Sequence, residues 1–135
     1  MADDELIGAL RSFFAARGPS IVCAYLYGSV ARGQARAGSD VDIGVLFRDP
    51  PPATLDGLAF DLAGEIERVI GRPVDLIVLN RAPPDLVHRV LRGGVLLAES
   101  DCPARVAFET RKRAEYFDVL PYLRQYRRPF ERRSA

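Results

Sequence analysis

Apolar residues recur along the chain at two spacings, one typical of helices and one typical of strands. Near the N-terminus, five apolar residues fall at helical spacing: Leu6, Ile7, Leu10, Phe13 and Phe14. This spacing predicts a first helix, with Asp3 as its N-cap and with Gly18-Pro19 ending it. Its apolar stripe is expected to pack into a core.

Four segments have the composition or the alternation of strands. Residues 21–27 are rich in β-branched and aromatic side chains and predict a buried strand. Residues 41–47 and residues 74–79 each alternate with period two, so each predicts a strand. Residues 95–98 could form a short fourth strand.

Two helical patterns lie between these strands. The first is expected to be capped by Thr54 and to run to Ile70, because its apolar residues recur at helical spacing. The second is expected to open at Pro83-Pro84-Asp85 and to close at Gly93-Gly94. Helices that alternate with strands in this way predict an α/β (α+β) fold.

The C-terminal part differs from the rest in pattern and in charge. A helical segment is expected over residues 103–126, bent near Pro121, with a basic tail after it. Residues 104–135 carry a net charge of +5, whereas residues 1–103 carry −4. The tail could meet an acidic partner or nucleic acid, or it could be a solvated helix end. The whole chain, residues 1–135, has the length of one domain.

The overall composition is that of a soluble globular protein, with 48% hydrophobic and 27% charged residues. No apolar run approaches the roughly 20 residues that cross a bilayer, so no membrane partner is expected. An acidic N-terminal segment argues against a secretory signal, and we expect a cytoplasmic protein. No stacking pattern of a known RNA module accompanies the basic tail, so direct nucleic-acid binding is not expected.

Several single residues have a structural explanation as well as a functional one. Cys23 and Cys102 lie far apart without metal-type spacing, which favours buried reduced thiols over a disulfide. His88 is interpreted as a partly exposed structural residue. Five aromatic residues of the last helical segment are expected to be mostly core, while an exposed subset could dock a partner; these are Phe108, Tyr116, Phe117, Tyr122 and Tyr126.

Candidate chemistry is concentrated where two of the predicted strands meet the loop between them. Gly28-Ser29 follows the first strand, and Asp40 and Asp42 open the second after ten intervening residues. The alternation puts Asp40 and Asp42 on one face, roughly 6–7 Å apart. Asp75 lies inside the third strand, where an acid is costly unless it is paired or metal-bound.

These residue types favour the binding of a nucleotide together with a metal. Carboxylates are suitable ligands for one or two Mg²⁺ ions, whose remaining positions are filled by water and substrate phosphates. Gly28 allows a phosphate to approach the backbone, and Ser29 adds a hydroxyl donor. Arg32 could bind a phosphate or could fix the loop through a salt bridge. Both roles for Arg32 stay open from the sequence.

The central motif resembles a known family. Gly28-Ser29, ten residues and then Asp40-Val41-Asp42 is similar to the signature of the nucleotidyltransferase superfamily typified by DNA polymerase β. The fuller motif also resembles that of the MNT group of minimal nucleotidyltransferases. The resemblance implies a small mixed sheet flanked by helices, and it implies the strand order, which periodicity does not show.

The resemblance also implies a role for each motif residue. Gly28 and Ser29 would hold the phosphates of ATP, and Asp40 and Asp42 would bind Mg²⁺. Asp75 would be the third carboxylate, either as a general base for the acceptor hydroxyl or as a further metal ligand. The group resembles the antitoxin half of HEPN/MNT toxin–antitoxin pairs. This implies transfer of AMP from ATP to a tyrosine of a HEPN ribonuclease toxin.

Two alternatives have different consequences. The first keeps the chemistry but transfers the nucleotide to a small molecule such as an aminoglycoside, for which a homo-oligomer could supply the missing binding surface. The second is an antitoxin that neutralises its toxin by binding alone. A resistance assay tests the first alternative. Asp42→Ala tests the second, because binding alone predicts that this variant still neutralises the toxin, whereas the catalytic antitoxin needs the carboxylate.

Overall fold

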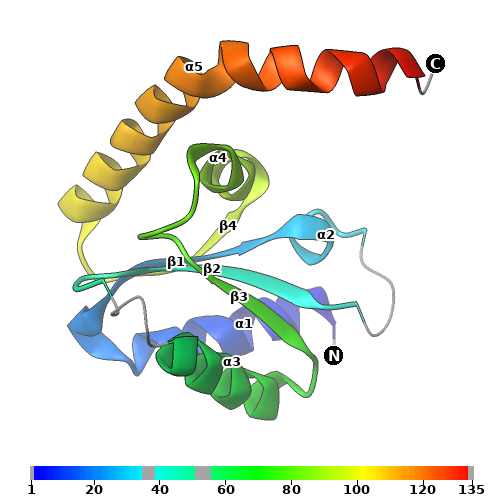
Figure 1. Ribbon diagram of the computed structural model, residues 1–135. Helices are drawn as coiled ribbons and strands as arrows, with labels where there is room; N and C mark the ends of the chain where they lie inside the picture. The colour runs from blue at the N-terminus through cyan, green and yellow to red at the C-terminus, as the bar shows by residue number, and fades with distance from the viewer. Residues whose placement is uncertain (1, 35–38, 51–55, 134–135) are drawn as a thin grey trace.

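A four-stranded sheet forms the centre of the protein, with the strand order β3-β2-β1-β4 (Figure 1). The computed structural model describes residues 2–34, 39–50 and 56–133. β1 pairs antiparallel with both of its neighbours, whereas β2 and β3 are parallel. The expected small mixed sheet is therefore confirmed. Its strands are β1 (Ile21–Tyr27), β2 (Val41–Phe47), β3 (Val74–Val78) and β4 (Val95–Glu99).

Helices cover both faces of this sheet. α1 and α3 lie on one face, and α4 with the first part of α5 lies on the other (Figure 1). α2 is a single turn directly after β1, and a 3-10 turn at Gly18–Ser20 leads from α1 into β1. The helices are α1 (Asp3–Ala15), α2 (Gly28–Ala31), α3 (Asp56–Ile70), α4 (Pro84–Gly93) and α5 (Cys102–Arg133).

The alternation of β2 divides the interior into two apolar clusters. Val41, Ile43 and Val45 are fully buried in the cluster that α1 and α3 cover. Leu46 belongs to the second cluster, beneath α4 and α5. The stripe of α1 packs into the first cluster as its spacing predicts, with three of its residues buried. Each residue step along β2 therefore changes the face that a side chain serves.

Some local predictions differ from the structure. Asp3 is the first helical residue of α1, and the N-cap is Ala2, whose side chain makes no capping bond. The predicted cap Thr54 lies outside the described residues. Cys23 is buried as expected, but Cys102 is exposed; both thiols are free. Cys102 opens α5 at the surface, where no core residue covers it.

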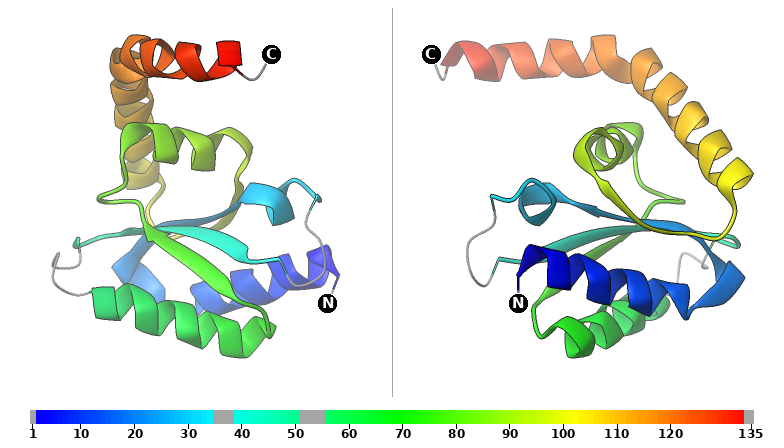
Figure 2. Two further views of the ribbon diagram at one scale, coloured as in Figure 1. Left: turned by 45° about the vertical axis from the view of Figure 1, so that its right-hand side comes forward. Right: turned by 180° about the vertical axis from the view of Figure 1, so that it is seen from behind.

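α5 is longer than the segment predicted from the sequence. It continues as a helix to Arg133 and changes direction in its middle, so that its last turns lie away from the sheet (Figure 2). A bend is expected here because Pro121 cannot donate a helical hydrogen bond. Three aromatic residues are exposed rather than core, with 64–77% of their surface accessible: Phe117, Tyr122 and Tyr126.

The first half of α5 is fixed to the sheet by a network of polar contacts. The Tyr25 hydroxyl donates to a Glu109 carboxylate oxygen at 2.6 Å. Arg105 binds the same carboxylate at 2.9 Å and binds Glu99 of β4 at 2.7 Å. These bonds join β1, β4 and α5. No helix within the described ranges is long and apolar enough to span a membrane.

Candidate active site

The turn from β1 into α2 places Gly28 against a carboxylate of the neighbouring strand. Gly28 has a φ of +75°, a conformation that disfavours residues with a Cβ. A Cβ at this position would lie 2.3 Å from Oδ2 of Asp42. Two features therefore require glycine at this position: the conformation of the turn and the close approach to Asp42. Ser29 follows at the start of α2, half-buried.

Three polar side chains form a row across adjacent strands. Tyr27 pairs with Asp42 in the β1–β2 register, and Asp42 pairs with Asp75 in the β2–β3 register. Register partners present their side chains on the same face of a sheet, with strands about 4.8 Å apart. The row thus brings Asp42 and Asp75 together, although 32 residues separate them along the chain.

The electrostatics of this row follow from its geometry. Burial raises the pKa of the Asp42 carboxyl, and the nearby negative charges of Asp75 and Asp40 raise it further. Burial also raises the pKa of the Tyr27 hydroxyl to about 12, with Asp42 and Asp75 adding to the rise. Such like-charge crowding favours a bound cation, because a cation would relieve the repulsion.

A cavity of about 840 Å³ opens over this row. On one side it is lined by the β1–α2 turn and the two carboxylates, and on the other side by α4. Its size is within the range of small-molecule sites, roughly 300–1,000 Å³. The lining residues from the sheet and α2 are Tyr27, Gly28, Ser29, Arg32, Asp42, Asp75 and Ile77; those from α4 are Leu86, Arg89, Arg92 and Gly93.

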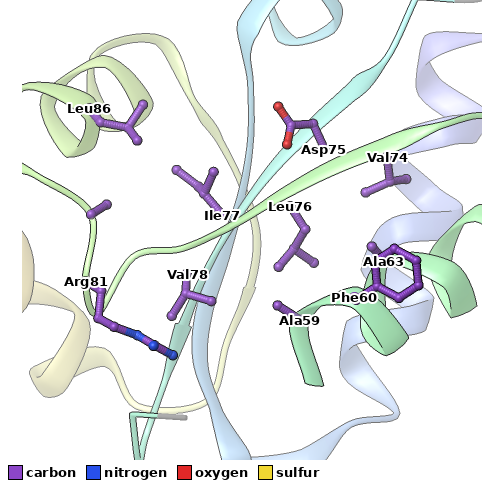
Figure 3. Close-up of a pocket in the computed structure, with 11 residues that line it drawn as sticks. Ala59, Phe60, Ala63, Val74, Asp75, Leu76, Ile77, Val78, Arg81 and Leu86 are labelled. Atoms are coloured by element: carbon purple, nitrogen blue, oxygen red, sulfur yellow. The ribbon is translucent and has the colours of Figure 1, made fainter. Parts of the chain in front are cut away.

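Asp75 is not buried, which corrects the expectation that an apolar strand would enclose it. It is exposed because β3 is the edge strand of the sheet. Figure 3 shows Asp75 on the α4 side of β3, with Leu76 and Val78 on the α3 side. A second cavity, of about 550 Å³ and mostly apolar, follows this edge, and Asp75 lines both cavities. Asp75 therefore stands at the mouth of the site, where a large acceptor has access.

Asp40 lies beside the cavity and is not part of its lining. It is exposed and immediately precedes β2. Two contacts fix the segment around it: Arg72 Nη2 donates to the carbonyl of Ser39 at 3.0 Å, and the amide of Val41 donates to the carbonyl of Pro73 at 2.9 Å. The loop before β3 thus holds Asp40 close enough to Asp42 to raise its pKa.

The donor set fits Mg²⁺ bound together with a substrate. Among the described residues, no three His, Cys, Asp or Glu side chains converge into a ready-made metal cage. Mg²⁺ does not need such a cage, because it is commonly held by one or two carboxylates plus substrate phosphates. The carboxylates of Asp42 and Asp75, with Asp40 beside them, supply that type of site. Their roles as metal ligands stay predictions.

Sequence reasoning missed the α4 wall of the cavity. Arg89 and Arg92 lie three residues apart on an amphipathic helix, a pattern that a solvated helix face also shows. His88, on another side of α4, stacks on Tyr116 of α5 with ring centroids 3.7 Å apart, in keeping with its predicted structural role. In the sequence, only the proximity of Asp75 could have pointed to Arg89. β3 leads into α4, and both residues line the same cavity.

Comparisons with known proteins identify the family and the fold. The family model described as polymerase beta, nucleotidyltransferase matches residues 10–102. A protein assigned as a minimal nucleotidyltransferase is 33% identical, with a TM-score of 0.55 over 70% of this chain and 95% of the other. No curated protein sequence matches the chain.

Two solved toxin–antitoxin complexes contain chains of similar structure. One, solved with AMP-PNP, has a chain that is 23% identical at a TM-score of 0.68, covering 99% of this chain and 98% of that one. The other is a tri-AMPylated Shewanella oneidensis HEPN toxin in complex with MNT antitoxin, at 20% identity and a TM-score of 0.68, covering 98% of each chain. At identities of 23% and 20%, the structural likeness shows that these chains share the fold of this one.

The match over most of the chain, from α1 through β4, identifies its class: the chain belongs to the polymerase β family of nucleotidyltransferases. The predicted family and fold are therefore confirmed, and so is the prediction that the protein is a nucleotidyltransferase.

Proposed function

We propose that the protein is a Mg²⁺-dependent antitoxin that transfers AMP from ATP to a tyrosine hydroxyl of a HEPN ribonuclease toxin. The observation that carries this proposal is the row of Asp42 and Asp75 beside Gly28-Ser29 in one cavity of about 840 Å³. The carboxylates and the Gly-Ser turn face the same space, as metal-assisted transfer at phosphorus requires.

The Gly-Ser turn and the three carboxylates have distinct proposed roles. Gly28 and Ser29 hold the phosphates, and Gly28 keeps the backbone close to Asp42. Asp40 and Asp42 hold Mg²⁺, which supplies charge neutralisation at the α-phosphate and lowers the pKa of the acceptor hydroxyl. Asp75, exposed at the mouth of the cavity, accepts the proton of the incoming hydroxyl or completes the metal site.

The nucleotide and the acceptor class are supported by the structural neighbours. One of them was solved with AMP-PNP, an ATP analogue, and another contains an AMPylated HEPN toxin with its MNT antitoxin. An open edge strand beside the site also suits a protein acceptor, because a tyrosine on a partner surface can reach Asp75. A small acceptor needs an enclosed pocket, and the exposed mouth of the cavity is less suited to that role.

The decisive experiment is transfer of label to a partner. The protein, α-labelled ATP, Mg²⁺ and the HEPN protein encoded beside it are incubated together, and the modified residue is found by mass spectrometry. We expect labelling of a toxin tyrosine, and we expect Asp42→Ala to slow it by about 10³-fold or more, since it removes a metal ligand. Asp61→Ala, an exposed acid on α3, is the matched control and should transfer normally.

The outcomes separate this proposal from the alternatives. No transfer to any protein from any nucleoside triphosphate would overturn it. Transfer to an aminoglycoside but not to the toxin would identify a small-molecule acceptor. A role by binding alone has one structural observation in its favour, the exposed aromatic residues of α5. That role predicts that Asp42→Ala still neutralises the toxin.

A further inference from the structure

α4 presents a different kind of side chain on each of its sides. Val87 and Val90 are fully buried in the apolar cluster beneath the helix. His88 faces α5 and stacks on Tyr116. Arg89 and Arg92 line the cavity opposite the carboxylates. Because two sides of α4 are fixed by packing, the third side holds its two arginines over the cavity.

Neither guanidinium on this wall has a carboxylate partner among residues 2–34, 39–50 and 56–133. Within the described part of the chain, no ion pair within 4 Å involves Arg89 or Arg92. Arg105, by contrast, binds Glu99 at 2.7 Å and Glu109 at 2.9 Å. A guanidinium that lines a cavity without a partner can bind a phosphate through two parallel hydrogen bonds.

The charge of Arg89 reaches the row of polar residues across the cavity. It lowers the pKa of the Tyr27 hydroxyl, against the larger effects of burial and of Asp42 and Asp75. The cavity is thus polarised, with carboxylates on the sheet and guanidiniums on α4. α2 and α4 also contact each other, and Arg32, directly after α2, lines the same cavity.

A nucleoside triphosphate fits this polarity in one orientation. The α-phosphorus must lie at the carboxylates, where metal and acceptor meet. The β- and γ-phosphates then extend from there, and their charge requires cationic partners. We propose that Arg89 and Arg92 bind these two phosphates and stabilise the pyrophosphate as it leaves. This inference rests on the proposed function, since it assigns the donor side of the same site.

The reaction is a displacement at the α-phosphorus. The acceptor oxygen forms a bond to the α-phosphorus, and the bond from that phosphorus to the oxygen bridging to the β-phosphate breaks. The electron pair stays on the departing pyrophosphate, where both guanidiniums meet the added charge. The acceptor proton passes to Asp75 or to solvent. The arginines therefore act on the leaving group and have no part in activating the acceptor.

The test compares ATP with its two parts, AMP, which carries the nucleoside and the α-phosphate, and pyrophosphate, which stands for the β- and γ-phosphates. Binding of Mg²⁺–ATP, Mg²⁺–pyrophosphate and AMP to the protein alone is measured by calorimetry for wild-type protein and for Arg89→Ala/Arg92→Ala. We expect ATP and pyrophosphate to bind at least about 10-fold more weakly to the double variant, while AMP binds as before. Arg89→Lys/Arg92→Lys should lose part of this affinity, because it keeps the charge and loses the bidentate geometry.

Arg68→Ala is the matched control, since Arg68 is an exposed arginine on α3 that lines neither cavity. It should change none of the three affinities, which excludes a general effect of net charge. An equal loss for AMP and ATP would overturn the inference, because the arginines would then contact the nucleoside. Unchanged binding of all three ligands to the double variant would overturn it as well.

The binding assay also separates this inference from the proposed function. Wild-type protein that binds ATP through these arginines but transfers nothing to the toxin would refute the acceptor and leave the phosphate site standing. Normal transfer to the toxin by the double variant, at wild-type rate and wild-type KM for ATP, would refute the phosphate site and leave the acceptor standing.

Discussion

The two faces of the sheet are built from the same strands but serve different purposes. The face under α1 and α3 is closed and apolar, with Val41, Ile43 and Val45 fully buried. The face under α4 carries an apolar cluster at one end and the polar cavity at the other, where Asp42 lies. Asp42 and Ile43 are adjacent in sequence. One residue step along β2 therefore separates a residue of the site from a residue of the core.

The two faces contribute differently to stability. The closed face provides the burial that stabilises the sheet, so the open face can hold close carboxylates whose repulsion costs stability. Substitutions on the closed face should change unfolding alone. Those at the cavity should change transfer, and those at the covered end of the α4 face should again change unfolding.

The largest effect on stability is expected for Ile43→Ala on the closed face. Its side chain is fully buried, so truncation should lower the free energy of unfolding by about 2–5 kcal/mol. The rate of AMP transfer per folded molecule should be unchanged. Urea unfolding and a transfer assay at low temperature measure the two quantities. A loss of transfer larger than the loss of folded protein would contradict the division between the faces.

Gly28→Ala should be next, with Gly33→Ala as its matched control. Both glycines have a positive φ, of 75° and 69°, so alanine at either position costs about 1–2 kcal/mol of backbone strain. Only at Gly28 would the new Cβ meet Asp42, since nothing lies within 4 Å of one at Gly33. Transfer should therefore fall in Gly28→Ala and persist in Gly33→Ala. Equal transfer by both variants would count against the placement of Gly28.

A smaller effect is expected at the covered end of the α4 face, for Tyr25→Phe. The hydroxyl donates to Glu109 at 2.6 Å, and burial followed by this bond raises the pKa of Tyr25 well above its usual value. Loss of the bond should cost about 1.5 kcal/mol in urea unfolding. Tyr122→Phe on the exposed part of α5 is the control and should stay within about 0.5 kcal/mol of wild type. If both variants unfold alike, the network does not fix α5.

The smallest effect at pH 7 is expected for Cys23→Ala, which also removes a dependence of stability on alkaline pH. Burial raises the pKa of this thiol from 9.0 to about 11. Between these values the unfolded chain releases the proton while the folded chain keeps it, so stability falls as pH rises through this window. Cys23→Ala should cost about 1 kcal/mol at pH 7. Its deficit relative to wild type should shrink from pH 9 to pH 11; a constant deficit would mean that Cys23 does not titrate there.

Periodicity and motif spacing were sufficient for most of the fold and for part of the site. The strand ending at Tyr27 and the alternation around Asp42 are local patterns, and local patterns survive folding because one face of each strand must be buried. The exposure of Asp75 is not local. It depends on β3 being the edge strand, and that order arises from pairing between segments far apart in the chain.

The arginines of α4 were missed for a related reason. Charged residues three apart on a helix are compatible with plain solvent exposure, and only the tertiary packing of α4 shows which side faces the cavity. The exposed aromatic residues of α5 are a similar case. A residue such as Tyr122 looks like core in sequence, but 66% of its surface is accessible on α5.

The stack of His88 on Tyr116 joins two helices with separate duties. α4 faces the nucleotide cavity, while α5 carries exposed aromatic residues beyond the stack. A change in the position of Tyr116 would act on α4 through this contact, and α4 holds Arg89 at the cavity. The packing of α5 therefore bears on the wall of the cavity that faces Asp42.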